Sequence, residues 1–130
     1  MTLHLTKEES KVFLSITSAE MHCLVDEYDP DLGGRPSKKR MQGLERLKGI
    51  AKKWEDTQPK IKETEFVNLD DVKACDMDLS DIERFYVKKL IEKAVIDTRK
   101  YLEPIPTPYK GVLLEIKEDA DTADQLAKRL

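Results

Sequence analysis

The amino-acid sequence predicts a mainly α fold, a small bundle of three principal helices with a shorter helix near the C-terminus. Two capping boxes support this prediction, Thr6 with Glu9 and Ser80 with Glu83, since each places a glutamate three residues after a hydroxyl side chain. Apolar residues recur at helical spacing after both boxes. The 130-residue chain also has only five glycines, fewer than the many turns of a β-sandwich or barrel would favour.

The first helix is predicted to run from Thr6 to about Tyr28, ahead of Asp29-Pro30. Its apolar residues form two stripes on nearly opposite sides. One stripe consists of Val12, Ile16, Ala19 and Cys23. A helix that is apolar over so much of its surface is either central in its bundle or shared with another chain, so homodimerisation through this helix is a secondary hypothesis.

Further helices are predicted over about residues 37–56 and 80–102, and residues 119–130 form the short terminal helix. The apolar arcs of the first and third helices are the widest, so these two helices should form the centre. Residues 65–69 and 111–117 each fit a strand or a helix. One short two-stranded pairing between about Phe66 and Val112 is therefore an alternative for these segments.

Length and composition predict one compact domain over residues 1–130, located in the cytoplasm. No apolar stretch approaches the length of a membrane span, and residues 1–11 lack the apolar run of a signal peptide. The formal net charge of −3 gives no overall attraction to nucleic acid or anionic lipid. Two cysteines are too few for a disulfide framework.

Charge is segregated along the chain. Between Arg35 and Trp54, eight basic residues stand against one acid, Glu45, for a formal charge of +7, whereas residues 63–83 carry −7. On a helical wheel most of the basic residues fall opposite Leu47 and Trp54. The candidate site for a partner or for phosphate groups consists of Arg35, Lys38, Lys39, Arg46, Lys52 and Lys53.

This basic helix has three interpretations. It packs against the acidic segment 63–83 or is simply solvated; it neutralises the phosphates of a nucleic acid; or it binds an acidic partner surface. Gly34-Arg35-Pro36 is similar to the short arms that enter an A·T-rich minor groove, although no helix-turn-helix follows it. A protein partner is the leading expectation, nucleic acid is the alternative, and no membrane partner is expected.

One polar stripe has the residue types of a catalytic triad. Ser18, His22 and Asp26 lie at i, i+4 and i+8 on one helix face. A hydrolase also needs an oxyanion site and a sharply held nucleophile, and nothing near these residues in the sequence offers either. A hydrolase-like enzyme is therefore a remote alternative.

Metal-ligating residue types are present without a recognised spacing. The possible zinc ligands fit no zinc motif, and the aspartates near residues 70–81 fail the EF-hand pattern and are better explained by capping and the helix dipole. No metal and no cofactor are expected. The residues concerned are His4, His22, Cys23, Cys75, Asp70, Asp71, Asp76, Asp78 and Asp81.

The remaining motifs are structural. The proline run at 104–108 is interpreted as a stiff connector rather than a polyproline ligand, and the glycine-rich phosphate-binding loops are absent. The leading hypothesis is a small, non-catalytic interaction or regulatory protein that acts through charged and apolar helix surfaces.

Overall fold

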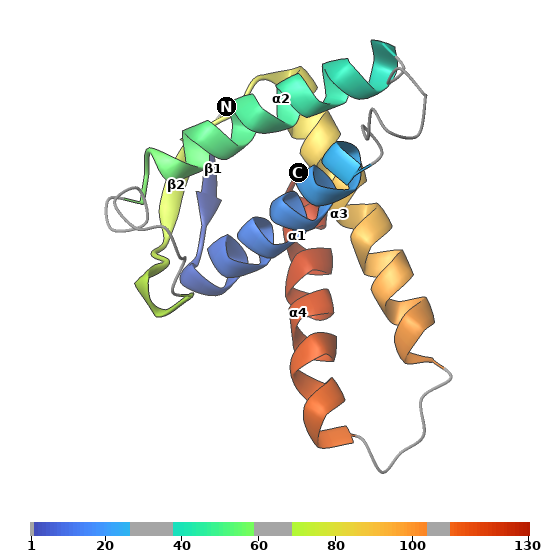
Figure 1. Ribbon diagram of the computed structural model, residues 1–130. Coiled ribbons are helices and arrows are strands. Elements are labelled where there is room, and N and C mark those ends of the chain that lie inside the picture. Colours follow the sequence, from blue (N-terminus) through green and yellow to red (C-terminus); the bar gives the residue numbers. More distant parts are fainter. Residues whose placement is uncertain (1, 27–37, 59–68, 104–109) are drawn as a thin grey trace. The chain divides into compact units, whose positions relative to one another are not determined.

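A computed structural model of the chain describes residues 2–26, 38–58, 69–103 and 110–130, and it has the mainly α fold that the sequence predicts (Figure 1). Within these residues the helices are α1 (Lys7–Asp26), α2 (Lys38–Glu55), α3 (Asp81–Leu102) and α4 (Lys110–Arg129). The strands are β1 (Thr2–Leu5) and β2 (Cys75–Asp78), and a 3₁₀ turn covers Leu69–Asp71.

The chain divides into two compact units, Met1–Leu79 and Ser80–Leu130. In the first unit α1 packs on α2, and in the second α3 packs on α4. The single domain over residues 1–130 and the common centre of the first and third helices stay predictions.

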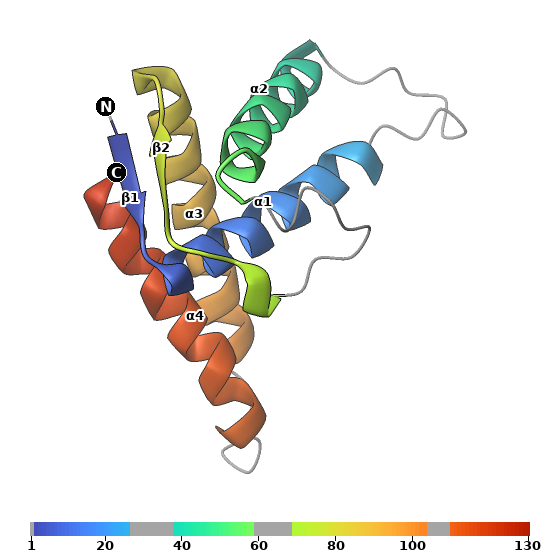
Figure 2. The ribbon, with the colours of Figure 1, turned by 90° about the vertical axis from the view of Figure 1, so that its left-hand side faces the viewer.

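The sheet of the first unit pairs the start of the chain with β2 (Figures 1 and 2). The two strands are antiparallel, with Leu3 opposite Met77 and Leu5 opposite Cys75. Leu3, Leu5 and Met77 are buried, as the two-residue period of a strand requires. The prediction of one short two-stranded pairing is confirmed, but its location between Phe66 and Val112 is wrong, because residue 112 lies in helix α4; Phe66 lies outside the described residues.

The capping box at Thr6 forms as predicted and starts α1. The Thr6 backbone N–H donates to Glu9 Oε1 at 3.0 Å, and the Glu9 N–H donates to Thr6 Oγ1 at 3.2 Å. Among the described side chains of α1, those that are fully buried lie between residues 9 and 17. The predicted stripe is therefore only partly buried: Val12 is enclosed, whereas Ala19 and Cys23 are exposed because the neighbouring elements cover only the first half of the helix.

The second unit is an antiparallel helical hairpin that begins at the second predicted capping box. Ser80 Oγ accepts from the Glu83 N–H at 3.2 Å, and Glu83 Oε1 accepts from the Ser80 N–H at 3.0 Å. The side chains buried in this unit are mainly branched on α3 and small on α4, which allows the two helices to approach closely. They are Val87, Leu90, Ile91, Val95, Ala120, Ala123, Leu126, Ala127 and Leu130.

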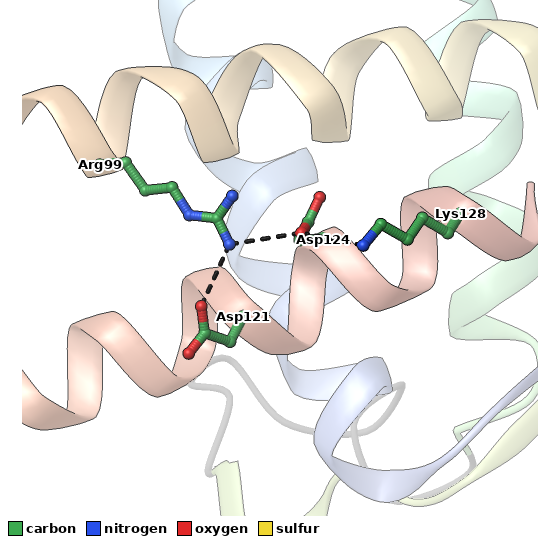
Figure 3. A network of polar contacts seen from close by, with 4 residues as sticks. All are labelled: Arg99, Asp121, Asp124 and Lys128. Carbon is green, nitrogen blue, oxygen red and sulfur yellow. Dashed lines mark hydrogen bonds and ion pairs between the residues drawn. The ribbon is translucent and has the colours of Figure 1, made fainter.

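Polar contacts tie the two ends of the hairpin. Near the C-terminus of α3, Arg99 Nη2 donates to Asp121 Oδ1 at 3.1 Å and to Asp124 Oδ2 at 3.3 Å, and Lys128 Nζ lies 3.6 Å from Asp124 Oδ2 (Figure 3). At the opposite end, the Nε of Arg84 donates to the backbone oxygen of Leu130 at 2.7 Å.

The final helix is longer than predicted, since α4 begins at Lys110 rather than near residue 119.

Candidate functional site: the basic face of helix α2

Helix α2 is held in place by one apolar face. Leu47 and Ile50 are completely buried and Trp54 is 2% exposed. These three residues follow helical spacing, so they line the same side of the helix. The orientation of α2 about its own axis is set by this burial, and the opposite side is left toward solvent.

The indole of Trp54 fixes the contact between α2 and α1, which lie side by side (Figure 2). Its Nε1–H donates to the buried Ser10 Oγ at 2.8 Å, and its ring centroid lies 6.5 Å from that of Phe13. Ser10 Oγ lies 4.0 Å from the Sγ of Cys75, so α1, α2 and β2 meet around one hydroxyl group. Within the described residues, no buried side-chain nitrogen or oxygen lacks a hydrogen-bond partner.

A buried glutamine secures the chain just beyond the end of α2. Gln58 Nε2 donates to the Lys73 carbonyl oxygen at 2.9 Å, and Gln58 Oε1 accepts from the Lys73 N–H at 2.9 Å. The side-chain amide thus pairs with a backbone as a neighbouring strand would. Both residues lie in the first unit, so these two hydrogen bonds anchor the chain where it leaves α2.

The outer side of α2 carries the basic face, which we define as Arg46, Lys48, Lys52 and Lys53. All four side chains are exposed. The eight residues from Arg46 to Lys53 cover about two helical turns, or roughly 10 Å along the axis. Four positive charges are therefore displayed on a short surface that the buried apolar side holds rigid.

The members of the basic face differ in their contacts. Lys53 Nζ donates to the Asp78 backbone oxygen at 3.0 Å, and Arg46 also has an interaction within the chain. The side chains of Lys48 and Lys52 make no hydrogen bond or ion pair with any residue that the structure describes. Lys48, absent from the predicted site, stands four residues before Lys52, and this i, i+4 spacing is the signal that would have found it.

The remaining predicted site residues fall at the edge of the described part of the chain. Lys38 and Lys39 lie in the first turn of α2, and their side chains are outside the part of the chain that the structure describes. Arg35 and the segment Gly34-Arg35-Pro36 also lie outside the described residues. The structure thus places three predicted members on one exposed surface, Arg46, Lys52 and Lys53.

The outer side of α2 is not uniformly positive. Glu45 and Glu55 are exposed on the same outer side of the helix. Gly49 lies between the basic side chains, and an added Cβ there would meet nothing within 4 Å. The surface therefore combines four cations, two anions and one position at which the backbone is openly accessible.

The triad-like stripe on α1 shows no catalytic arrangement among its described side chains. Ser18 and His22 are exposed, and no hydrogen bond joins them; the side chain of Asp26 lies outside the description. The absence of enzymatic activity stays a prediction.

The possible metal ligands lie in separate places. His4 Nδ1 is 2.5 Å from Asp76 Oδ1 across the β1–β2 pair, whereas His22 and Cys23 are exposed on α1. In the described part of the chain, no group of three or more His, Cys, Asp or Glu side chains could hold a metal ion. The proline run at 104–108 lies outside the described residues.

Comparisons with protein-family models, curated proteins and solved structures gave no match to this chain. None of the helices in the described segments is both long enough and apolar enough to cross a membrane.

Proposed function

We propose that this chain is a small, non-catalytic interaction protein whose binding surface is the basic face of α2. The observation that carries this proposal is the division of α2 into a completely buried apolar side and an exposed charged side. A helix held by Leu47, Ile50 and Trp54 presents its charges without having to order a backbone on binding.

The partner we propose is a protein with an acidic surface. A purely positive helix would suit a line of phosphates, but the exposed carboxylates of Glu45 and Glu55 would repel them. An acidic protein surface can place a neutral or basic group opposite each of these two glutamates. Mixed charge of this kind supplies partner specificity and faster association more than affinity alone.

Nucleic acid is the second candidate, and Gly49 is the observation that favours it. The open space above Gly49 would let a sugar–phosphate backbone approach the helix closely between the basic side chains. Four phosphate contacts predict a slope of about −3.6 in log K against log salt for duplex DNA, or an affinity loss of about 100-fold between 50 and 200 mM salt.

A cytoplasmic location completes the proposal. Cys23 and Cys75 are free thiols, and unpaired cysteines suit a reducing compartment.

The experiment is fluorescence anisotropy with three labelled probes of equal formal charge: a glutamate-rich peptide, a DNA duplex and a single-stranded RNA. We expect the peptide to bind more tightly than either nucleic acid, and Lys48→Glu/Lys52→Glu to abolish its binding. Lys7→Glu/Lys11→Glu is the matched control, because it makes the same charge change at the same spacing on α1.

The outcomes separate the two candidates. Tighter binding of DNA or RNA, lost in the α2 variant and retained in the α1 control, would replace the protein partner with nucleic acid. Equal binding by wild type and both variants would show that the basic face is not the binding surface.

A further inference from the structure

A second exposed surface lies on α3, in the second unit, and it is independent of the basic face. Ile82 and Phe85 are each 63% exposed and Ile96 is 53% exposed. These are large apolar side chains, and they lie away from the positions of α3 that are buried in the hairpin. Exposed apolar side chains that share one helix face are typical of an interaction surface.

The three apolar residues belong to one continuous stripe. Together with two charged residues, they recur at alternating spacings of three and four positions, which keeps side chains on a single helix face. The stripe extends over about 21 Å of helix axis at 1.5 Å per residue. We call it the α3 strip: Ile82, Phe85, Lys89, Glu92 and Ile96.

The charged centre of the α3 strip is internally ordered. Lys89 Nζ lies 3.8 Å from Glu92 Oε2 and 5.5 Å from the centroid of the Phe85 ring. The order of chemistry along the strip is therefore apolar, apolar, positive, negative, apolar. Reversing the direction of the helix exchanges the positive and negative positions and matches the aromatic residue with an isoleucine.

We propose that the α3 strip binds a second copy of this chain, with the two α3 helices antiparallel about a two-fold axis midway between Lys89 and Glu92. In this register Lys89 faces Glu92 of the other copy, and Phe85 faces Ile96 of the other copy. Each contact occurs twice, as a two-fold symmetric interface requires.

Charge complementarity indicates that the partner of the α3 strip is a second copy of the chain and that its α3 helix runs antiparallel. In a parallel pairing Lys89 would face Lys89 and Glu92 would face Glu92, and both contacts would be repulsive. The antiparallel register also brings the exposed side chains of Asp81 and Lys100 opposite each other. The part of the strip from Phe85 to Ile96 is thus complementary to itself in one direction only, and Ile82 falls opposite Arg99 of the other copy.

The test is sedimentation equilibrium of the full chain over a concentration series. With only three large apolar side chains per copy, we expect a dissociation constant on the order of 10–100 µM. The weight-average mass should rise from 15.0 kDa toward twice that value. Phe85→Ser should weaken the association at least about tenfold, whereas Leu114→Ser, which removes an exposed leucine from α4, should leave it unchanged.

A charge swap tests the register itself. Lys89→Glu and Glu92→Lys should each weaken the dimer, because each single change places like charges opposite one another twice. The double variant Lys89→Glu/Glu92→Lys should restore it, and circular dichroism checks that each variant keeps its helix content.

Three results would overturn the proposal: a monomer at all concentrations, a dimer unaffected by Phe85→Ser, or a double charge swap that fails to rescue the single changes. A dimer that instead weakens with substitutions on α1 would favour the interface predicted from the first helix. None of these outcomes changes the test of the basic face, which lies on α2.

Discussion

The hydroxyl of Ser10 is enclosed among α1, α2 and β2, and it accepts the only side-chain hydrogen that an indole can donate. Ser10 is completely buried and Trp54 nearly so, which means that neither group could turn to water if the other were lost. The energetic value of such a pair lies mostly in the cost of leaving one partner unsatisfied.

Ser10→Ala should therefore destabilise the protein by about 1–3 kcal/mol, because the Trp54 N–H would stay buried without an acceptor. Denaturant unfolding measured by tryptophan fluorescence reports this change directly, since Trp54 is the single tryptophan. Ser18→Ala, at an exposed position of the same helix, is the control and should have little effect. Equal stability of wild type and Ser10→Ala would contradict this account of the Trp54 contact.

At the scale of the element, α2 contains a glycine that its fold does not require. Gly49 is exposed in the helix interior, with open space where a Cβ would stand. Glycine in a helix interior is less favourable than alanine by about 0.8–1 kcal/mol.

Gly49→Ala should raise the free energy of unfolding by up to about 1 kcal/mol. Thermal unfolding followed by circular dichroism would show this as an increase of Tm. A lower Tm would mean that the outer side of α2 is covered in solution, and would contradict the interpretation of the basic face as a free surface.

The link between α3 and α4 at Arg99 is expected to contribute little. The Asp121 hydrogen bond, followed by the hydrogen bond and charge of Asp124, raises the pKa of Arg99 above its ordinary value, while partial desolvation opposes this rise. A raised pKa stabilises the fold at every pH below the ordinary arginine value, and this stabilisation is lost only as the pH rises through the folded value.

Arg99→Gln should therefore lower Tm by a few degrees at most, because exposed ion pairs are weak. The difference from wild type should be constant between about pH 6 and pH 9 and should shrink in high salt. Calorimetry at two salt concentrations measures both effects. A difference that disappears within that pH range would show that another titrating group controls the contact.

Sequence periodicity predicted the long helices more accurately than the short elements. Thr6 and Ser80 start α1 and α3 because capping boxes are local and need no tertiary partner. A short two-stranded pairing was predicted, but its strands were not located, because Thr2–Leu5 and Cys75–Asp78 have four residues each and so short an alternation cannot be separated from irregular chain. The early start of α4 was not predicted for a similar reason, because residues 111–117 fit both the period of a helix and the period of a strand.

The candidate surfaces were predictable only in part. Opposition to Leu47 and Trp54 placed Arg46, Lys52 and Lys53 correctly on an exposed side. The α3 strip was hidden inside a wide apolar arc, because a helical wheel shows which residues share a face but not which face a partner helix covers.

At the scale of the whole molecule, the chain combines two surfaces of different chemistry on two different units. The basic face is charged and belongs to Met1–Leu79, whereas the α3 strip is largely apolar and belongs to Ser80–Leu130. Electrostatic binding weakens with salt, but apolar association is maintained or strengthened by salts such as sulfate.

The most direct measurement of the central claim is an NMR titration of the isotope-labelled full chain with the glutamate-rich peptide. We predict that the largest amide shift changes will cluster between Arg46 and Lys53, and that Lys48→Glu/Lys52→Glu will remove them. Shift changes confined to residues 80–130, or spread evenly over every lysine of the chain, would contradict the claim that the basic face of α2 is the binding surface.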